Sequence, residues 1–126
     1  MRTQKLGGLA AERGNKAERV VAAWLEAQGY ELVALNLRIG YLEIDIVARR
    51  EELIVVVEVR TRAGRSYTTG YGSLGQEKRR RVRLAADRLW WRRYANDPTA
   101  ERLRIDAATV RFTDAGIALE YCEAAF

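Results

Sequence analysis

Two strand-like segments joined by a short acidic turn constrain the fold of this chain more than any other feature. Residues 42–48 alternate apolar and polar side chains, residues 53–59 are almost wholly apolar, and Glu51 and Glu52 stand between them. A strand with alternating side chains buries one face, whereas a nearly continuous apolar strand is covered on both faces. We therefore expect a β-hairpin whose second strand lies at the centre of a sheet.

The rest of the chain can complete and cover such a sheet. Apolar side chains recur at helical spacing in two segments, and turn residues separate the remaining apolar runs. The predicted helices cover residues 9–28 and 76–95, the predicted strands cover residues 30–39, 42–48, 53–59, 103–112 and 117–121, and a loop covers residues 62–75. The length of 126 residues is typical of one domain. The predicted fold class is α/β, a single domain in the order αβββαββ with a mixed central sheet flanked by helices.

The composition excludes several kinds of active site. The chain has no His and a single Cys, Cys122, so it cannot form a Ser/His or Cys/His pair, a zinc finger or an internal disulfide. A bound metal would need oxygen ligands from Asp and Glu, which favours Mg²⁺ or Mn²⁺. The longest apolar run, residues 53–57, is too short to span a membrane, and residues 1–15 lack the pattern of a secretory signal. We expect a cytoplasmic protein.

Positive charge is concentrated in one part of the sequence. The net charge is +5, yet residues 60–93 alone carry eleven basic side chains against two acidic ones. Such a block indicates a surface for a polyanion, and the alternative is a solvated helix face in a protein rich in arginine. We favour the first interpretation. The predicted nucleic-acid contacts come from the loop and the start of the second helix: Arg62, Arg65, Lys78, Arg79, Arg80 and Arg81.

Acidic side chains are expected to converge on the two strands of the hairpin. A turn centred between residues 51 and 52 places Asp45 opposite Glu58, and Glu43 opposite Arg60, all on one face. Directly opposed side chains have Cβ atoms about 5 Å apart, so the two carboxylates of Asp45 and Glu58 would repel each other. A divalent cation would relieve that repulsion and leave positions open for water and phosphate. The alternative is an internal ion pair of Glu58 with Arg60 or another arginine.

A third acidic residue lies on the first predicted helix. Glu18 shares a helical stripe with Val21 and Leu25, so it can face the sheet and approach the strand acids. A Glu that faces solvent is the alternative, and the spacing alone favours that alternative. Glu18 therefore supports a site only together with the acids of the hairpin.

The order and spacing of these residues resemble a known family. Glu18 precedes Glu-Ile-Asp at residues 43–45 and Glu-Val-Arg-Thr-Arg at residues 58–62, and Lys78 follows on the second helix. Together with residues 36–38 and 104–106, this pattern resembles the YraN-type family of small uncharacterised bacterial proteins. That family is similar to archaeal Holliday junction resolvases of the PD-(D/E)xK nuclease superfamily, which implies a restriction-endonuclease-like core.

The resemblance implies a role for each matching residue. Asp45 and Glu58 match the metal-binding acids and Glu18 matches the helix acid that completes the site, so these three would hold Mg²⁺ or Mn²⁺. Arg60 stands where the family has a Lys that orients the attacking water or stabilises developing charge. Lys78 matches a helix Lys that contacts phosphate or supports the site.

Two positions depart from the family pattern. Arg60 replaces a Lys, and arginine keeps its positive charge but cannot act as a base. Leu42 replaces a Gly, which is a residue that lets another backbone approach closely. The departures therefore bear on catalysis and on the geometry of the substrate near the site.

The expected function combines the site with the basic surface. The leading hypothesis is a metal-dependent DNA endonuclease or resolvase-like protein that acts on structured DNA, with Glu18, Asp45, Glu58 and Arg60 as catalytic residues. One alternative is a non-catalytic nucleic-acid-binding module that kept the nuclease fold. Another is an interaction protein whose basic helix docks an acidic partner. The expected partner is nucleic acid, DNA before RNA, without a membrane and with a homodimer left open.

Overall fold

Strand β3 (Leu53–Ala63) runs through the middle of a five-stranded sheet, as its apolar sequence predicts. The structure is a computed structural model that describes residues 9–63 and 75–126, with side chains from residues 16–62 and 75–126. The strands lie side by side in chain order, and the other four are β1 (Glu31–Ile39), β2 (Leu42–Arg50), β4 (Arg102–Thr113) and β5 (Gly116–Cys122). β3 and β4 are parallel and all other neighbours are antiparallel, so the sheet is mixed, as predicted.

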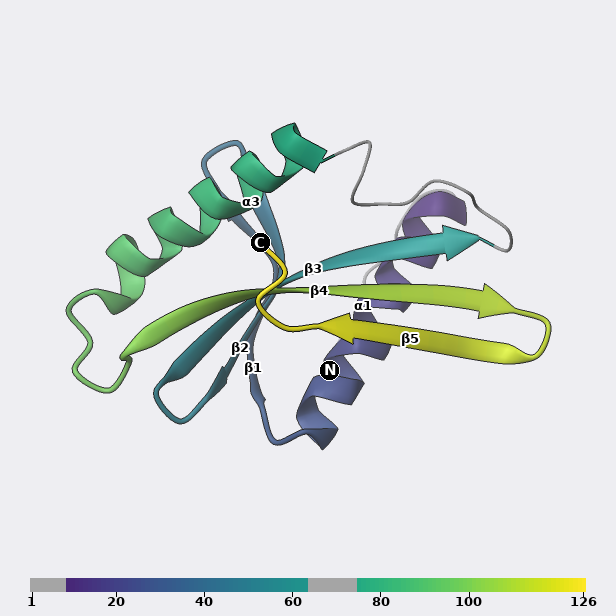
Figure 1. Cartoon of the computed structure of the whole chain (residues 1–126), viewed down its shortest axis with the longest axis horizontal. Helices are drawn as coiled ribbons and strands as arrows, with labels where there is room; N and C mark the ends of the chain where they lie inside the picture. The colour runs from purple at the N-terminus through teal and green to yellow at the C-terminus, as the bar shows by residue number, and fades with distance from the viewer. Residues whose placement is uncertain (1–8, 64–74) are drawn as a thin grey trace.

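A helix covers each face of the sheet (Figure 1). Helix α1 (Leu9–Ala27) lies on one face, and α3 (Gly75–Leu89), continued by a π-helical turn (Trp90–Tyr94), lies on the other. The predicted order αβββαββ is thereby confirmed. None of the helices in the described ranges is both long and apolar enough to cross a membrane.

The end of α1 follows from its sequence. Gly29 has a φ of +94°, a conformation that glycine adopts at little cost. The backbone N–H groups of Gly29 and Tyr30 donate to the carbonyl oxygens of Glu26 and Leu25, each at 3.0 Å. This pattern is the Schellman ending of a helix, and it turns the chain directly into β1.

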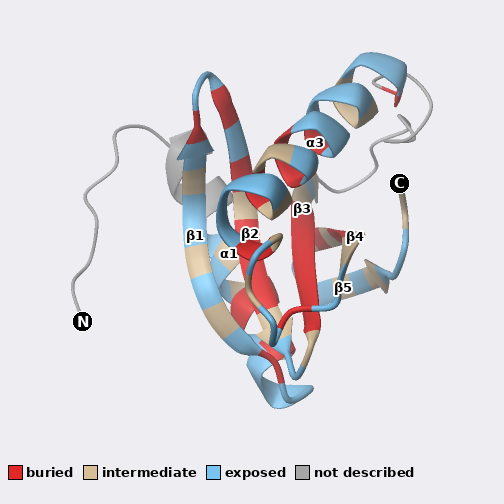
Figure 2. Ribbon diagram, turned by 90° about the vertical axis from the view of Figure 1, so that its left-hand side faces the viewer, coloured by how far each residue is buried: buried red, intermediate tan, exposed pale blue. Residues whose placement is uncertain are grey.

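The sheet separates two apolar cores, and β3 contributes to both (Figure 2). Val55 and Val57 pack with α1 on one face, whereas Ile54 and Val56 pack with α3 on the other. All four are at most 1% exposed. The uninterrupted apolar run is explained by this position, because every residue of the segment faces a helix.

A buried polar network ties β4 to β5 and to the segment that follows β5. Asp106 is 0% exposed, and its carboxylate accepts hydrogen bonds from the guanidinium of Arg104 at 2.8 Å, the hydroxyl of Tyr121 at 2.5 Å and the backbone N–H of Ala124 at 2.9 Å. Arg104 also donates to the hydroxyl of Tyr30 at 3.0 Å. A buried charge is tolerated when it is paired and hydrogen-bonded in this way. The Arg-x-Asp motif of residues 104–106 therefore has a structural role.

Candidate functional site

Strands β2 and β3 separate at the end of their hairpin that lies away from the turn. Their paired residues run from the turn to Ile46 and Val57, in the register predicted from the sequence, and the pairing then stops. One oxygen of Asp45 instead accepts a hydrogen bond from the backbone N–H of Val59 at 2.8 Å. The carboxylate of Asp45 thus replaces a backbone carbonyl as the acceptor for this strand N–H group.

The alternation of β2 also breaks at Asp45. Ile44 belongs to the core under α3, whereas Ile46 belongs to the core under α1, although a regular strand would place both on one face. On the neighbouring strand, Asn36 lies opposite Asp45 without pairing to it and has a φ of +51°. Irregularities of this kind redirect side chains and are frequent beside active sites.

These two features correct part of the predicted carboxylate face. The ladder ends at Ile46 and Val57, so the predicted cross-strand pairs of Asp45 with Glu58 and of Glu43 with Arg60 are both absent from it. Glu43 is exposed and lies opposite Arg38 of β1. The prediction that all four residues share one face relied on unbroken alternation, which fails in β2. Glu58 and Arg60 do share a face, because β3 stays in regular register with β4.

Asp45 and Glu58 nevertheless meet in one cavity of about 200 Å³ beneath α3. This cavity, termed the carboxylate pocket, is lined by Tyr41, Leu42, Glu43, Asp45, Glu58, Lys78, Arg81 and Val82. Glu58 is 6% exposed, and the Nζ atom of Lys78 lies 3.0 Å from its Oε2 atom. The buried Glu58 therefore has an ammonium partner that comes from the second helix.

The electrostatics of the pocket are dominated by its carboxylates. Burial and the neighbouring Glu58 raise the pKa of Asp45 from 3.8 to about 7, and Glu18 adds to this effect. The hydrogen bond from Val59 and the positive charge of Lys78 act in the opposite direction but are weaker. Asp45 is thus an acid whose ionisation is opposed by its surroundings.

Glu18 reaches the sheet from α1, although its helical spacing alone favoured an orientation toward solvent. Its Oε1 atom accepts a hydrogen bond from the side-chain amide of Asn36 at 3.0 Å. Its pKa is raised, first by burial and then by Glu43 and Glu58, while the bond from Asn36 lowers it. Glu18 therefore contributes to the negative potential of the site but does not line the carboxylate pocket.

The donor set fits a hard cation only in part. Among the residues that the structure describes, no group of three or more His, Cys, Asp or Glu side chains is arranged to hold a metal ion. The predicted set of Glu18, Asp45 and Glu58 is therefore not assembled as three ligands. Asp45 and Glu58 suffice for the simpler arrangement in which Mg²⁺ is bound by one or two carboxylates together with water and substrate phosphates.

Comparison with known proteins assigns the chain to a family. Residues 17–110 match the model of the uncharacterised protein family UPF0102. The chain belongs to this family. A UPF0102 protein of Sorangium cellulosum is 47% identical over 114 residues, which cover 90% of this chain and 79% of the relative. One of Leifsonia xyli is 45% identical over 100 residues, which cover 79% of this chain and 81% of the relative.

The YraN-type resemblance inferred from the motifs is confirmed by these matches. Among solved structures, that of Pyrococcus furiosus SfsA in complex with Ca²⁺ is similar to this chain with a TM-score of 0.44 and 14% identity. The match covers 96% of this UPF0102 chain and 74% of the SfsA chain.

The predicted basic residues of this UPF0102 protein lie on different sides of α3. Lys78 and Arg81 line the carboxylate pocket beside β2, whereas Arg80 lines a second groove beside β4. Arg79 is half-buried on the same helix. Charge patterning showed that the segment is basic, but the helical period determines which arginine faces which side.

The predicted basic residues of the strand and loop are separate from the pocket. Arg60 and Arg62 are half-buried in the last part of β3, outside the pocket lining, and Arg65 lies outside the described residues. Arg62 is paired with Arg111 of β4, a residue that sequence reasoning missed. The sequence feature that could have indicated Arg111 is its position on the strand that follows the basic helix.

Proposed function

We propose that this UPF0102 protein binds structured DNA and hydrolyses its phosphodiester backbone with Mg²⁺ or Mn²⁺ as cofactor. The observation that carries the proposal is the meeting of Asp45 and Glu58 in one pocket, with the ammonium of Lys78 at 3.0 Å from Glu58. Two carboxylates can hold a divalent cation, and an ammonium beside them can receive an anionic phosphate.

Each side chain of the pocket has a defined task in this hydrolysis. Water adds to phosphorus, the bond from phosphorus to one ester oxygen breaks, and the leaving oxygen takes up a proton. Asp45 and Glu58 would hold the cation, which when bound polarises the phosphate and makes water easier to deprotonate. With Glu58 engaged as a ligand, the ammonium of Lys78 can pair with a phosphate oxygen and stabilise the charge that develops in the transition state.

In this proposal the ammonium of the pocket comes from Lys78 rather than from strand position 60. Arg60 follows Glu58 by two residues on the same face of β3, but it does not line the pocket. An ammonium is a compact point charge, whereas a guanidinium is a wide planar fork. The pocket therefore contains a lysine even though position 60 is an arginine.

Nucleic acid is favoured as the substrate by the distribution of positive charge around the pocket. Lys78 and Arg81 line the pocket itself. Arg62 and Arg111 stand side by side on β3 and β4, a like-charge pair that an anion between them would stabilise. Contacts of this kind bind the sugar-phosphate backbone without reading the base sequence. A cytoplasmic location, expected from the sequence, is compatible with DNA as the partner.

The second candidate function is DNA binding without catalysis. It is favoured by two observations in the described part of the chain: Lys78 already neutralises Glu58, and a third metal ligand is not assembled. In that case the same basic surface would bind DNA, and Glu58 would serve to position Lys78.

A cleavage assay separates the two functions. End-labelled linear, flapped and four-way DNAs are incubated with Mg²⁺ or Mn²⁺ and with the wild type, Asp45→Asn or Glu58→Gln. Asp114→Asn, in the exposed turn between β4 and β5, is the matched control. Hydrolysis at this pocket predicts metal-dependent cleavage by wild type and control, reduced by about 100-fold or more in both pocket variants.

Two results would contradict the hydrolytic function. A wild type that binds these DNAs but cleaves none of them with either metal would support the binding module. Cleavage that persists in both pocket variants would place the active site elsewhere. The affinity of each protein for the same DNAs is measured separately without metal, so that loss of DNA binding is not mistaken for loss of catalysis.

A further inference from the structure

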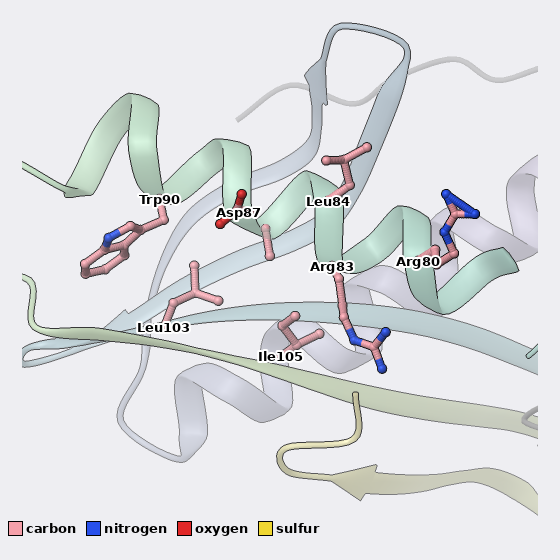
Figure 3. Close-up of a pocket in the computed structure, with 8 residues that line it drawn as sticks. Arg80, Arg83, Leu84, Asp87, Trp90, Leu103 and Ile105 are labelled. Atoms are coloured by element: carbon pink, nitrogen blue, oxygen red, sulfur yellow. The ribbon is translucent and has the colours of Figure 1, made fainter. Parts of the chain in front are cut away.

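A groove between α3 and β4 takes no part in the proposed hydrolysis. It has a volume of about 620 Å³, within the range of pockets that hold small molecules, and is termed the α3–β4 groove (Figure 3). The residues that matter for its chemistry are Arg80, Arg83, Asp87, Trp90, Leu103 and Ile105. The carboxylate pocket lies on the β2 side of the same helix.

The wall and floor of the groove are apolar. Leu103 and Ile105 are half-buried on the face of β4 that is turned toward α3. The indole of Trp90 extends from the helix toward β4, at the end of the groove where Leu103 lies and away from Ile105 (Figure 3). Trp90 opens the π-helical turn, in which the N–H of Ala95 donates to the carbonyl of Trp90 at 2.8 Å. Such turns are rare and occur often at functional positions.

The charged residues of the groove are ordered along α3. Arg80 and Arg83 are exposed at the end nearer the start of the helix, and Asp87 follows one turn later, toward Trp90. The ion pair of Arg80 with Glu77 spans 3.9 Å between two largely exposed side chains, so it competes weakly with another anion. The groove therefore offers a cationic end, an aromatic surface and one hydrogen-bond acceptor.

We infer that the α3–β4 groove binds one unpaired nucleotide of the DNA, with its phosphate at Arg80 and Arg83 and its base against Trp90. The carboxylate of Asp87 is then in place to accept a hydrogen bond from an amino group of the base. The inference rests on the proposed function and narrows its substrate to DNA that contains unpaired nucleotides. In a continuous duplex the bases are stacked and cannot enter the groove.

Charge complementarity favours a nucleotide over an acidic peptide. Both ligands could pair with Arg80 and Arg83, but the carboxylate of Asp87 would repel a peptide rich in Asp and Glu. The same carboxylate suits the amino groups of adenine, cytosine or guanine, which are hydrogen-bond donors. Because α3 carries Arg81 toward the carboxylate pocket and Arg80 toward the groove, one DNA strand that crosses the helix can reach both.

The first test measures what the base contributes to binding. A duplex with a one-adenine bulge is compared by fluorescence anisotropy, without metal, with the same duplex carrying an abasic bulge, which keeps the phosphate. Stacking on an aromatic side chain predicts that the adenine bulge binds about 5- to 150-fold more tightly to the wild type. Trp90→Leu should remove this difference. Trp91→Leu is the matched control, because Trp91 is 67% exposed and does not line the groove.

The second test uses the tryptophans as reporters. The adenine-bulged duplex should quench the fluorescence of the wild type and of Trp91→Leu, but not that of Trp90→Leu. The fluorescence of Trp24 should be a constant background, since this residue of α1 stacks on Tyr121 of β5 with ring centroids 4.5 Å apart, away from the groove. Circular dichroism of each variant verifies that the fold is retained.

Four outcomes would overturn the inference. Equal affinity for the adenine and abasic bulges, or equal quenching in both variants, would exclude a base on Trp90 while leaving the proposed DNA binding intact. Quenching at Trp90 by a 16-residue amphipathic Leu/Glu peptide, without quenching by the bulged duplex, would assign the groove to a protein partner. Failure of the wild type to bind any DNA would refute the proposed function and this inference together.

Discussion

The pH dependence of stability provides a direct measurement of the strain in the carboxylate pocket. In the folded, metal-free protein, burial and Glu58 raise the pKa of Asp45 from 3.8 to about 7. The folded protein therefore holds the proton of Asp45 more tightly than the unfolded chain does. Its contribution to the free energy of unfolding is fully present below about pH 4 and is lost as the pH rises through 7.

The size of this effect follows from the shift. A pKa difference of about 3 between the folded and unfolded states corresponds to about 4 kcal/mol in the free energy of unfolding. Partial exposure of the pocket reduces this contribution to roughly 2–3 kcal/mol. The variant Asp45→Asn cannot ionise, yet its amide oxygen can still accept the hydrogen bond from Val59. At pH 8 the free energy of unfolding of the variant should exceed that of the wild type by this amount, and its Tm should be higher by roughly 10 °C for a domain of this size.

The assay is urea denaturation followed by circular dichroism at pH 5 and pH 8 in the presence of EDTA. The wild type should lose stability between the two pH values, whereas Asp45→Asn should lose much less. Asp114→Asn makes the same chemical change in an exposed turn and should keep the wild-type dependence. An equal loss in Asp45→Asn and the wild type would refute the close approach of Asp45 and Glu58.

Four further predictions follow from the same contacts. Mn²⁺ or Mg²⁺ at pH 8 should raise the Tm of the wild type but not that of Asp45→Asn, as thermal melts with and without metal would show. Lys78→Met leaves Glu58 buried without its partner and should lower the free energy of unfolding by about 1–3 kcal/mol, measured in urea. Asp106→Ala leaves a half-buried guanidinium and a half-buried hydroxyl without their acceptor and should cost about 3 kcal/mol in the same assay. Replacing residues 79–81 by Ala should reduce the slope of log affinity against log salt by about 2–3 in DNA titrations, and an unchanged slope would place the binding surface elsewhere.

The fold could be predicted because local and global signals agree. The apolar run of residues 53–59 required cover on both faces, and each face has its helix. Gly29 stands where α1 needs a positive φ, and the turn at residues 51–52 sets the register that continues to Ile46 and Val57. The second predicted helix, residues 76–95, is in fact α3 with a π-helical turn, which requires an irregular hydrogen bond that periodicity does not reveal.

The site could be predicted only in part. The register places Asp45 and Glu58 at the same end of the hairpin, and both line one pocket, but they are not a ladder pair. A strict period of two cannot anticipate a strand whose alternation breaks between Ile44 and Ile46. The proximity of Lys78 to Glu58 depends on how α3 crosses the sheet, and this is a tertiary property with no local signal. The bond between Asn36 and Glu18 likewise joins residues of two elements that pack only in the folded chain.

The opening of the hairpin at Asp45 is difficult to explain by stability alone. A continued β2–β3 ladder with apolar side chains would satisfy the backbone and fill the space under α3, as it does from Ile46 and Val57 to the turn. The chain instead ends the ladder, satisfies the N–H of Val59 with a carboxylate, and places a second carboxylate beside the first. Departures of this kind from local rules are expected at functional or strained positions. In the proposed function this unfavourable charge pair binds the divalent cation, so the loss of stability and the proposed metal binding would have one physical origin.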